Sequence, residues 1–122
     1  MIDRLFESVG GSKTISELVQ RFYDRVLADP HLAPFFPNTD MAALQAKQVM
    51  FISMLLGSGQ TYRGRDLSTA HAAARAQGLN DEHFDALLGH FRASLQDMHV
   101  AEDFTREILA KLETTRNAVL AR

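Results

Sequence analysis

Hydrophobic residues recur every three or four positions along most of the chain, which is the spacing of one face of an amphipathic helix. The spacing predicts helices over about 13–28, 40–56, 81–98 and 101–121, with a shorter one around 67–77. The stripe of the first helix consists of Ile15, Leu18, Val19, Phe22, Val26 and Leu27. No stretch shows the strict alternation of a half-buried strand, so we predict an all-α fold.

Polar and helix-breaking residues stand where these helices should begin and end. The short polar side chains that can cap a first turn are Ser12, Thr39 or Asp40, Asp66, and Asn80 or Asp81. Pro30 should stop the first helix, and Gly78 should stop the short one. The corner after Pro30 holds two adjacent aromatics, Phe35 and Phe36, between two further prolines. Burial of at least one of these rings is expected, because two exposed rings would be costly.

One histidine lies in the middle of an apolar stripe. Leu67, Ala70, His71 and Ala74 share one predicted helical face, and the neighbours of the imidazole are mostly small. This leaves space for a flat molecule to lie against the helix. From the residues alone, the pattern suits both a hydrogen-bonded core histidine and a ligand to a bound group, and the core histidine is the commoner case.

Two further polar groups interrupt apolar stripes. Gln48 lies between Leu44 and Ile52 on the second long helix. A buried amide there without hydrogen-bond partners would cost about 1–3 kcal/mol. Tyr23 lies beside Phe22 on the first helix, so its hydroxyl should point inward and needs a partner.

Composition narrows the classes of function. The 122 residues suffice for one domain, which we place at residues 1–122. With 13 basic against 15 acidic residues there is no positive surplus, so we expect neither nucleic acid nor membrane as a partner. The absence of cysteine excludes disulfides, thiolate metal sites and a cysteine-linked haem. No apolar run approaches a membrane span and the N-terminus lacks a signal-peptide core, so we expect a cytoplasmic protein.

Several motifs, in order and in register, resemble one family. They are Leu5-Phe6 with Gly10-Gly11, Phe22-Tyr23-Asp24-Arg25, Pro34-Phe35-Phe36, Lys47-Gln48-Val49-Met50-Phe51, Tyr62-Arg63-Gly64-Arg65-Asp66-Leu67 with Ala70-His71, Gly78-Leu79-Asn80, and His83-Phe84-Asp85. Over roughly residues 5–95 they resemble the group I truncated haemoglobins, especially the cyanobacterial type. The resemblance implies a two-over-two helical sandwich around a haem b, with helices near 13–28 and 41–56 packed against those near 81–98 and 101–121.

The resemblance also implies roles for the three unusual polar residues. His71 would be the proximal ligand of the haem iron, and its second ring nitrogen would donate to a backbone carbonyl. Tyr23 and Gln48 would lie on the opposite side and donate hydrogen bonds to a bound gas. The alternative for this pair is that the two side chains bond each other, or the backbone, in a dry core.

The remaining haem contacts implied by the resemblance are Phe36, Leu44, Lys47, Phe51, Leu67, Ala70, Arg75 and Phe84. Lys47 would pair with a haem propionate at the rim or, as a neutral amine, coordinate ferric iron as a sixth ligand. Arg75 would reach a propionate or remain a solvated charge. Some cyanobacterial-type members bond a late histidine covalently to a haem vinyl group. Because no histidine follows His99, we expect the haem to be held non-covalently.

The function implied is the binding of O2, NO and CO at the haem iron. Two hypotheses follow the resemblance: nitric oxide dioxygenation with an external reductase, or an O2 carrier, store or sensor without turnover. A cofactor-free helical interaction module is the third hypothesis. In each case we expect a monomer.

Overall fold

The computed structural model describes residues 11–37, 39–57 and 64–122, so the motif residues at 5–10 and 62–63 lie outside it. Within the described residues the chain is helical and has no β-strand, which confirms the predicted all-α fold. The elements are α2 (Gly11–Ala28), the 3-10 turn η1 (Ala33–Phe35), α3 (Met41–Leu55), α4 (Gly64–Ala70), α5 (Ala72–Ala76), α6 (Asp81–Asp97), α7 (Glu102–Glu113) and α8 (Arg116–Val119).

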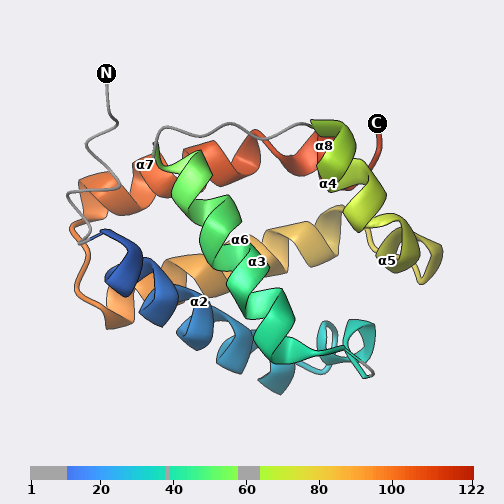
Figure 1. The fold of residues 1–122 in the computed structure, drawn as a ribbon, viewed down its shortest axis with the longest axis horizontal. Helices are drawn as coiled ribbons and strands as arrows, with labels where there is room; N and C mark the ends of the chain where they lie inside the picture. Colours follow the sequence, from blue (N-terminus) through green and yellow to red (C-terminus); the bar gives the residue numbers. More distant parts are fainter. Residues whose placement is uncertain (1–10, 38, 58–63) are drawn as a thin grey trace.

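The long helices pair in two layers (Figure 1). Helix α2 packs against α3, α6 packs against α7, and α2 also contacts α6, so one pair lies on the other. This confirms the expected two-over-two sandwich. The short helix α4 packs against α8 near the C-terminus. The apolar faces of the layers form a core that includes Ile15, Leu18, Val19, Phe22, Val26, Ile52, Leu95 and Ile108.

Three predicted helix boundaries are confirmed. Asp40 Oδ1 accepts a hydrogen bond from Ala43 N at 3.1 Å and caps α3. Asn80 Oδ1 accepts from amides in the first turn of α6, and Asn80 N donates to His83 Nδ1, which completes a capping box. Gly78 follows α5 with a φ of +101°, a left-handed conformation that glycine adopts without strain.

The prediction of one unbroken helix around the stripe histidine is wrong. Helix α4 ends one residue before His71 and α5 begins one residue after it, so His71 occupies a break. The carbonyl of Leu67 accepts bonds from both His71 N, at 3.1 Å, and His71 Nδ1, at 2.8 Å. This side-chain bond competes with a continued helical ladder. Two predicted caps are also wrong: Ser12 and Asp66 lie inside α2 and α4, because both helices begin earlier than expected.

The last predicted helix, 101–121, is likewise divided. Helix α7 ends at Glu113 and α8 begins at Arg116. The two threonines between them turn their hydroxyls back on the preceding turn. Thr114 Oγ1 donates to Lys111 O at 2.5 Å, and Thr115 Oγ1 donates to Leu112 O at 2.7 Å. Such local hydroxyl bonds compete with helix continuation, which accounts for the break.

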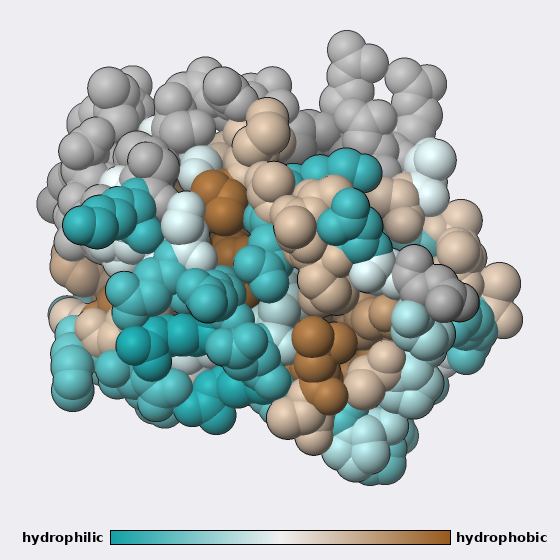
Figure 2. All heavy atoms as spheres, turned by 60° about the horizontal axis from the view of Figure 1, so that its bottom comes forward, coloured by the Kyte–Doolittle hydropathy of each residue, from teal (hydrophilic) through white to brown (hydrophobic). Residues whose placement is uncertain are grey.

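The outer surface differs in polarity from place to place. Seen from the side of α2, hydrophilic side chains gather in the lower left part of this face, and hydrophobic side chains are more frequent to the right of centre (Figure 2). Within the described parts of the chain, no helix has the length and apolar character that a membrane crossing needs.

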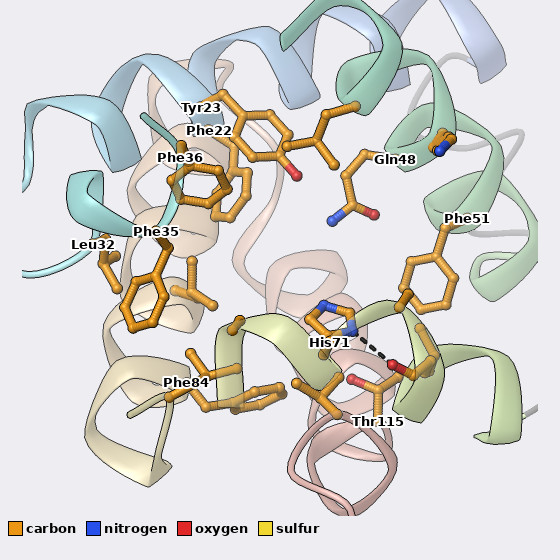
Figure 3. Close-up of a pocket in the computed structure, with 18 of the residues that line it drawn as sticks. Phe22, Tyr23, Leu32, Phe35, Phe36, Gln48, Phe51, His71, Phe84 and Thr115 are labelled. Atoms are coloured by element: carbon orange, nitrogen blue, oxygen red, sulfur yellow. Dashed lines mark hydrogen bonds between the residues drawn. The ribbon is translucent and has the colours of Figure 1, made fainter. Parts of the chain in front are cut away.

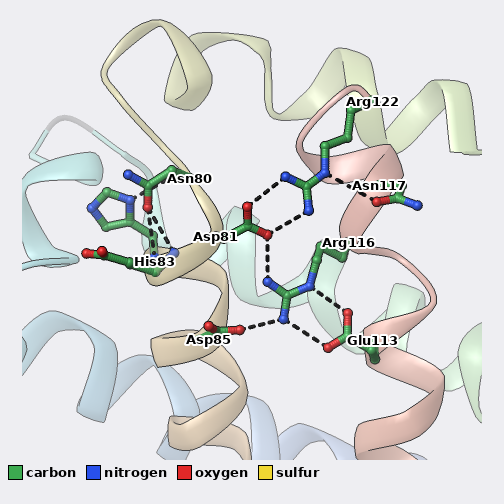
Figure 4. Close-up of polar contacts among 9 residues, drawn as sticks. Asn80, Asp81, His83, Asp85, Glu113, Arg116, Asn117 and Arg122 are labelled. Carbon is green, nitrogen blue, oxygen red and sulfur yellow. Dashed lines mark hydrogen bonds and ion pairs between the residues drawn. The ribbon is translucent and has the colours of Figure 1, made fainter.

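Arg116 connects α8 to α6 and α7 through hydrogen-bonded ion pairs (Figure 4). Its guanidinium donates to Asp81 and Asp85 of α6, at 2.8 and 2.5 Å, and to Glu113 of α7, at 2.6 Å. The carboxylates raise the pKa of Arg116, with the Glu113 hydrogen bond as the largest cause. Arg122 adds two bonds to Asp81, at 2.6 and 2.7 Å. Hydrogen bonds from Arg122 and then Arg116 lower the pKa of Asp81, and Arg116 lowers that of Glu113.

Arg116→Met should therefore destabilise the protein in a pH-dependent way. Carboxyl groups with a lowered folded-state pKa contribute stability above their ordinary pKa, near 4, and lose it as the pH falls through the folded value. The melting temperature, followed by circular dichroism, should fall by a few degrees at neutral pH. The deficit should shrink toward about pH 3. Arg21→Met, which breaks an exposed pair with Glu17 and leaves the Arg116 contacts in place, is the control. A deficit of equal size at both pH values would contradict the assignment.

Candidate functional site

Every described helix contributes to one cavity. Its volume is about 590 Å³, and its walls are mainly aliphatic and aromatic. This volume lies within the roughly 300–1,000 Å³ of small-molecule and cofactor sites. Prominent wall residues in the close-up view are Phe22, Leu32, Phe35, Phe36, Phe51 and Phe84 (Figure 3).

His71 enters the cavity from one side (Figure 3). Its Nδ1 lies 2.8 Å from the carbonyl oxygen of Leu67. A carbonyl only accepts hydrogen bonds, so Nδ1 carries a hydrogen, and in the neutral ring Nε2 then has the free lone pair. Nε2 is directed into the cavity. The break between α4 and α5 thus presents an oriented nitrogen donor to whatever occupies the space.

Tyr23 and Gln48 face His71 from the opposite side (Figure 3). Tyr23 is only 3% exposed, and it comes from α2 while Gln48 comes from α3. Burial raises the pKa of Tyr23 to about 12, and the neighbouring Gln48 side chain acts in the opposite direction. The phenol therefore stays protonated at neutral pH and remains a hydrogen-bond donor. Both side chains line the cavity, so their role as donors to a ligand stays a prediction.

Most of the predicted contact residues line the same cavity. They are Phe36, Leu44, Lys47, Phe51, Leu67, Ala70 and Phe84. Lys47 is the charged member of this set and is exposed, so it lies where the cavity meets solvent. The aromatic pair of the proline corner also faces the cavity, with Phe35 and Phe36 both partly buried.

Arg75 is the exception among the predicted contacts. It is absent from the residues that line the cavity. Its Nη1 instead donates to the carbonyl oxygens of Ser68 and Val119, each at 2.8 Å. The propionate contact of Arg75 stays a prediction, while the guanidinium is not simply a solvated charge, because it binds main-chain groups.

The cavity has a floor that the sequence pattern did not indicate. Thr115 and Val119, from the C-terminal end of the chain, line it together with Leu112. In the sequence, Val119 reads as part of an ordinary helix stripe and Thr115 as a helix-interior residue. The pair Thr114-Thr115 was the available signal, because two adjacent threonines weaken a helix and can turn its end toward a pocket.

A two-over-two helical sandwich encloses an apolar cavity, with an imidazole on one side and a phenol and an amide on the other. These features define a globin-type site. Comparison with known proteins gives the same class, since residues 4–121 match the family model described as bacterial-like globin.

Individual relatives agree along nearly the whole chain. A group 1 truncated hemoglobin of Tetrahymena pyriformis is 34% identical over 118 residues, covering 97% of this chain and 95% of the relative. One from Synechocystis is 38% identical over 107 residues, covering 87% and 86%. The crystal structure of the 2/2 hemoglobin from Synechococcus sp. PCC 7002 superposes with a TM-score of 0.90 at 35% identity, covering 97% of this chain and 98% of that one.

This chain belongs to the bacterial-like globins and, within them, to the group 1 truncated hemoglobins. Membership of this family implies haem binding and small gas ligands such as O2.

Proposed function

We propose that the cavity holds a haem b non-covalently, with Nε2 of His71 as the iron ligand. The observation that carries this proposal is the bond from His71 Nδ1 to Leu67 O, which leaves a fixed lone pair aimed into an apolar space of suitable volume. Second-sphere bonds of this type are how proteins orient a metal-binding imidazole. The similar Synechococcus protein carries a covalently attached heme. Here no histidine follows His99, so we propose no covalent link.

The haem, when bound, supplies an iron that binds diatomic gases at its open side. The tyrosine–glutamine pair would then donate hydrogen bonds to the ligand. In a cavity with apolar walls these donors are worth more than in water, and they favour a ligand that gains negative charge. We propose O2 as the favoured ligand on this basis, with NO and CO as further ligands. Lys47, at the mouth of the cavity, would pair with a propionate in preference to reaching the iron, because its side chain is exposed.

As the activity, we propose nitric oxide dioxygenation, in which NO and O2 would combine to nitrate with one electron from ferrous haem iron, and an external reductase would return the resulting ferric iron to the ferrous state. The neutral phenol of Tyr23 supports this reading, because it can hold O2 in place until NO arrives. An O2 carrier, store or sensor is the second candidate, and the same pair of donors supports it. We propose in both cases a monomer that acts in the cytoplasm.

Haem binding is tested by adding hemin to the purified protein and recording the absorption spectrum. We expect stoichiometric uptake with an intense band at the blue edge of the visible range. His71→Ala should lose most of this affinity, because it removes the nitrogen donor. His31→Ala, which changes an exposed histidine, should behave as wild type. If the protein took up no hemin, the proposal would be wrong, and the hypothesis of a cofactor-free helical interaction module would be favoured.

The proposed activity is tested by stopped-flow mixing of the oxygenated protein with NO. We expect rapid formation of nitrate, and repeated turnover when a reductase is supplied. Tyr23→Phe should release O2 at least tenfold faster, since a charge-assisted hydrogen bond is worth about 1.5–3 kcal/mol. Gln48→Leu should act in the same direction. Nitrate formation without re-reduction by any cellular reductant would favour the carrier or sensor instead.

A further inference from the structure

The helix break at His71 leaves main-chain groups that need partners. Because α4 ends at Ala70, carbonyls of its last turn can accept hydrogen bonds from groups outside the helix. The Leu67 carbonyl is occupied by the amide and the ring of His71 itself. The next carbonyl, that of Ser68, accepts from Nη1 of Arg75 at 2.8 Å. The bond that orients the imidazole and the bond from Arg75 thus fall on adjacent carbonyls.

Arg75 closes the break from its other side. It belongs to α5, which begins directly after His71, and Arg75 N also donates to His71 O at 3.0 Å. The Arg75 side chain returns across the break to Ser68 in α4. The residue therefore binds the main chain at His71 and, through its guanidinium, the main chain three residues before it.

The same guanidinium nitrogen reaches a third helix. Arg75 Nη1 also donates to the carbonyl of Val119, at 2.8 Å, and this is the last residue of α8. Helix α8 is itself held to α6 and α7 by Arg116. The Val119 side chain lines the cavity floor. Two arginines therefore connect three helices by charged hydrogen bonds. Arg116 joins α8 to α6, and Arg75 joins α8 to the turn of α4 that carries the Leu67 carbonyl.

We propose that Arg75 is a positioning residue for His71, which makes the placement of the proximal nitrogen depend on the docking of the C-terminal helix. Arg75 does not touch the cavity. Its guanidinium holds the last turn of α4, through the Ser68 carbonyl, against the Val119 carbonyl of α8. The neighbouring Leu67 carbonyl then stays aligned with His71 Nδ1, and Nε2 keeps its direction into the cavity. This inference rests on the proposed haem site.

The test compares hemin-loaded full-length protein with its Arg75→Met variant, which keeps the length of the side chain and loses its donors. Two readouts report on His71: the iron–imidazole stretching band of the unligated ferrous form in resonance Raman spectra, and the rate of hemin transfer to an excess of a haem-scavenging apoprotein. Arg75→Met should shift or broaden the band and speed transfer about tenfold, as expected for lost hydrogen bonds from a charged donor. Arg75→Lys, which restores a cationic donor, should recover part of both effects.

Two variants at other arginines make the comparison specific. Arg106→Met removes an exposed arginine of α7 that pairs with Asp103, and it should change neither readout. Arg116→Met releases α8 and should move both readouts in the same direction as Arg75→Met. In the double variant the two effects should be less than additive, because both substitutions interrupt one line of support.

A purely structural role for Arg75 would lower the melting temperature and leave the Raman band and the transfer rate unchanged, and that result would overturn the inference. If Arg75→Met fails to fold, the same two readouts in Arg75→Lys and Arg116→Met decide it, with wild-type values in both overturning it. Wild-type protein that takes up no hemin would overturn the proposed function and this inference together. Normal wild-type uptake with an unaltered variant would overturn this inference alone.

Discussion

The hydrogen bond between His71 Nδ1 and the carbonyl of Leu67 is the interaction on which the site depends. It does two things at once. It draws the ring onto the preceding turn, where the helix is interrupted, and it fixes which ring nitrogen carries the hydrogen. Without this bond the imidazole could rotate or exchange tautomers, and its lone pair would have no fixed direction. The interruption of the helix is therefore part of the site.

The opposite side of the cavity places two polar groups, the Tyr23 phenol and the Gln48 amide, in an apolar space. Tyr23 is almost fully buried, and its raised pKa keeps it neutral, so no charge is buried there. Gln48 lines the same side of the cavity as Tyr23. The two polar groups therefore lie where a ligand would be met.

The elements that could be predicted are those set by local patterns. The Asn80 cap, the glycine stop at Gly78 and the inward positions of Tyr23 and Gln48 follow from spacing and from side-chain chemistry within a few residues. The break at His71 could not be predicted in this way, because the apolar spacing runs through it without interruption. The break coincides with a bond from the His71 side chain to the Leu67 carbonyl, which the apolar spacing does not reveal.

The role of Arg75 depends on contacts that are remote in sequence. Its partner Val119 is 44 residues away, and the position of that carbonyl depends on how α8 docks. A long cationic side chain near an expected haem edge suggests a propionate contact, whereas its bonds to two main-chain carbonyls do not follow from the sequence pattern. The position of Thr115 in the cavity wall could not be predicted either. It depends on the division of the last helix into two, and the helical spacing of apolar residues does not reveal that division.

The most direct measurement is the position of iron in crystals of the hemin-loaded protein, taken from anomalous scattering at the iron absorption edge. We predict one iron peak in the cavity, within bonding distance of Nε2 of His71 and on the side that faces Tyr23 and Gln48. An iron peak at another histidine, or a cavity without iron in protein that has taken up hemin, would contradict it.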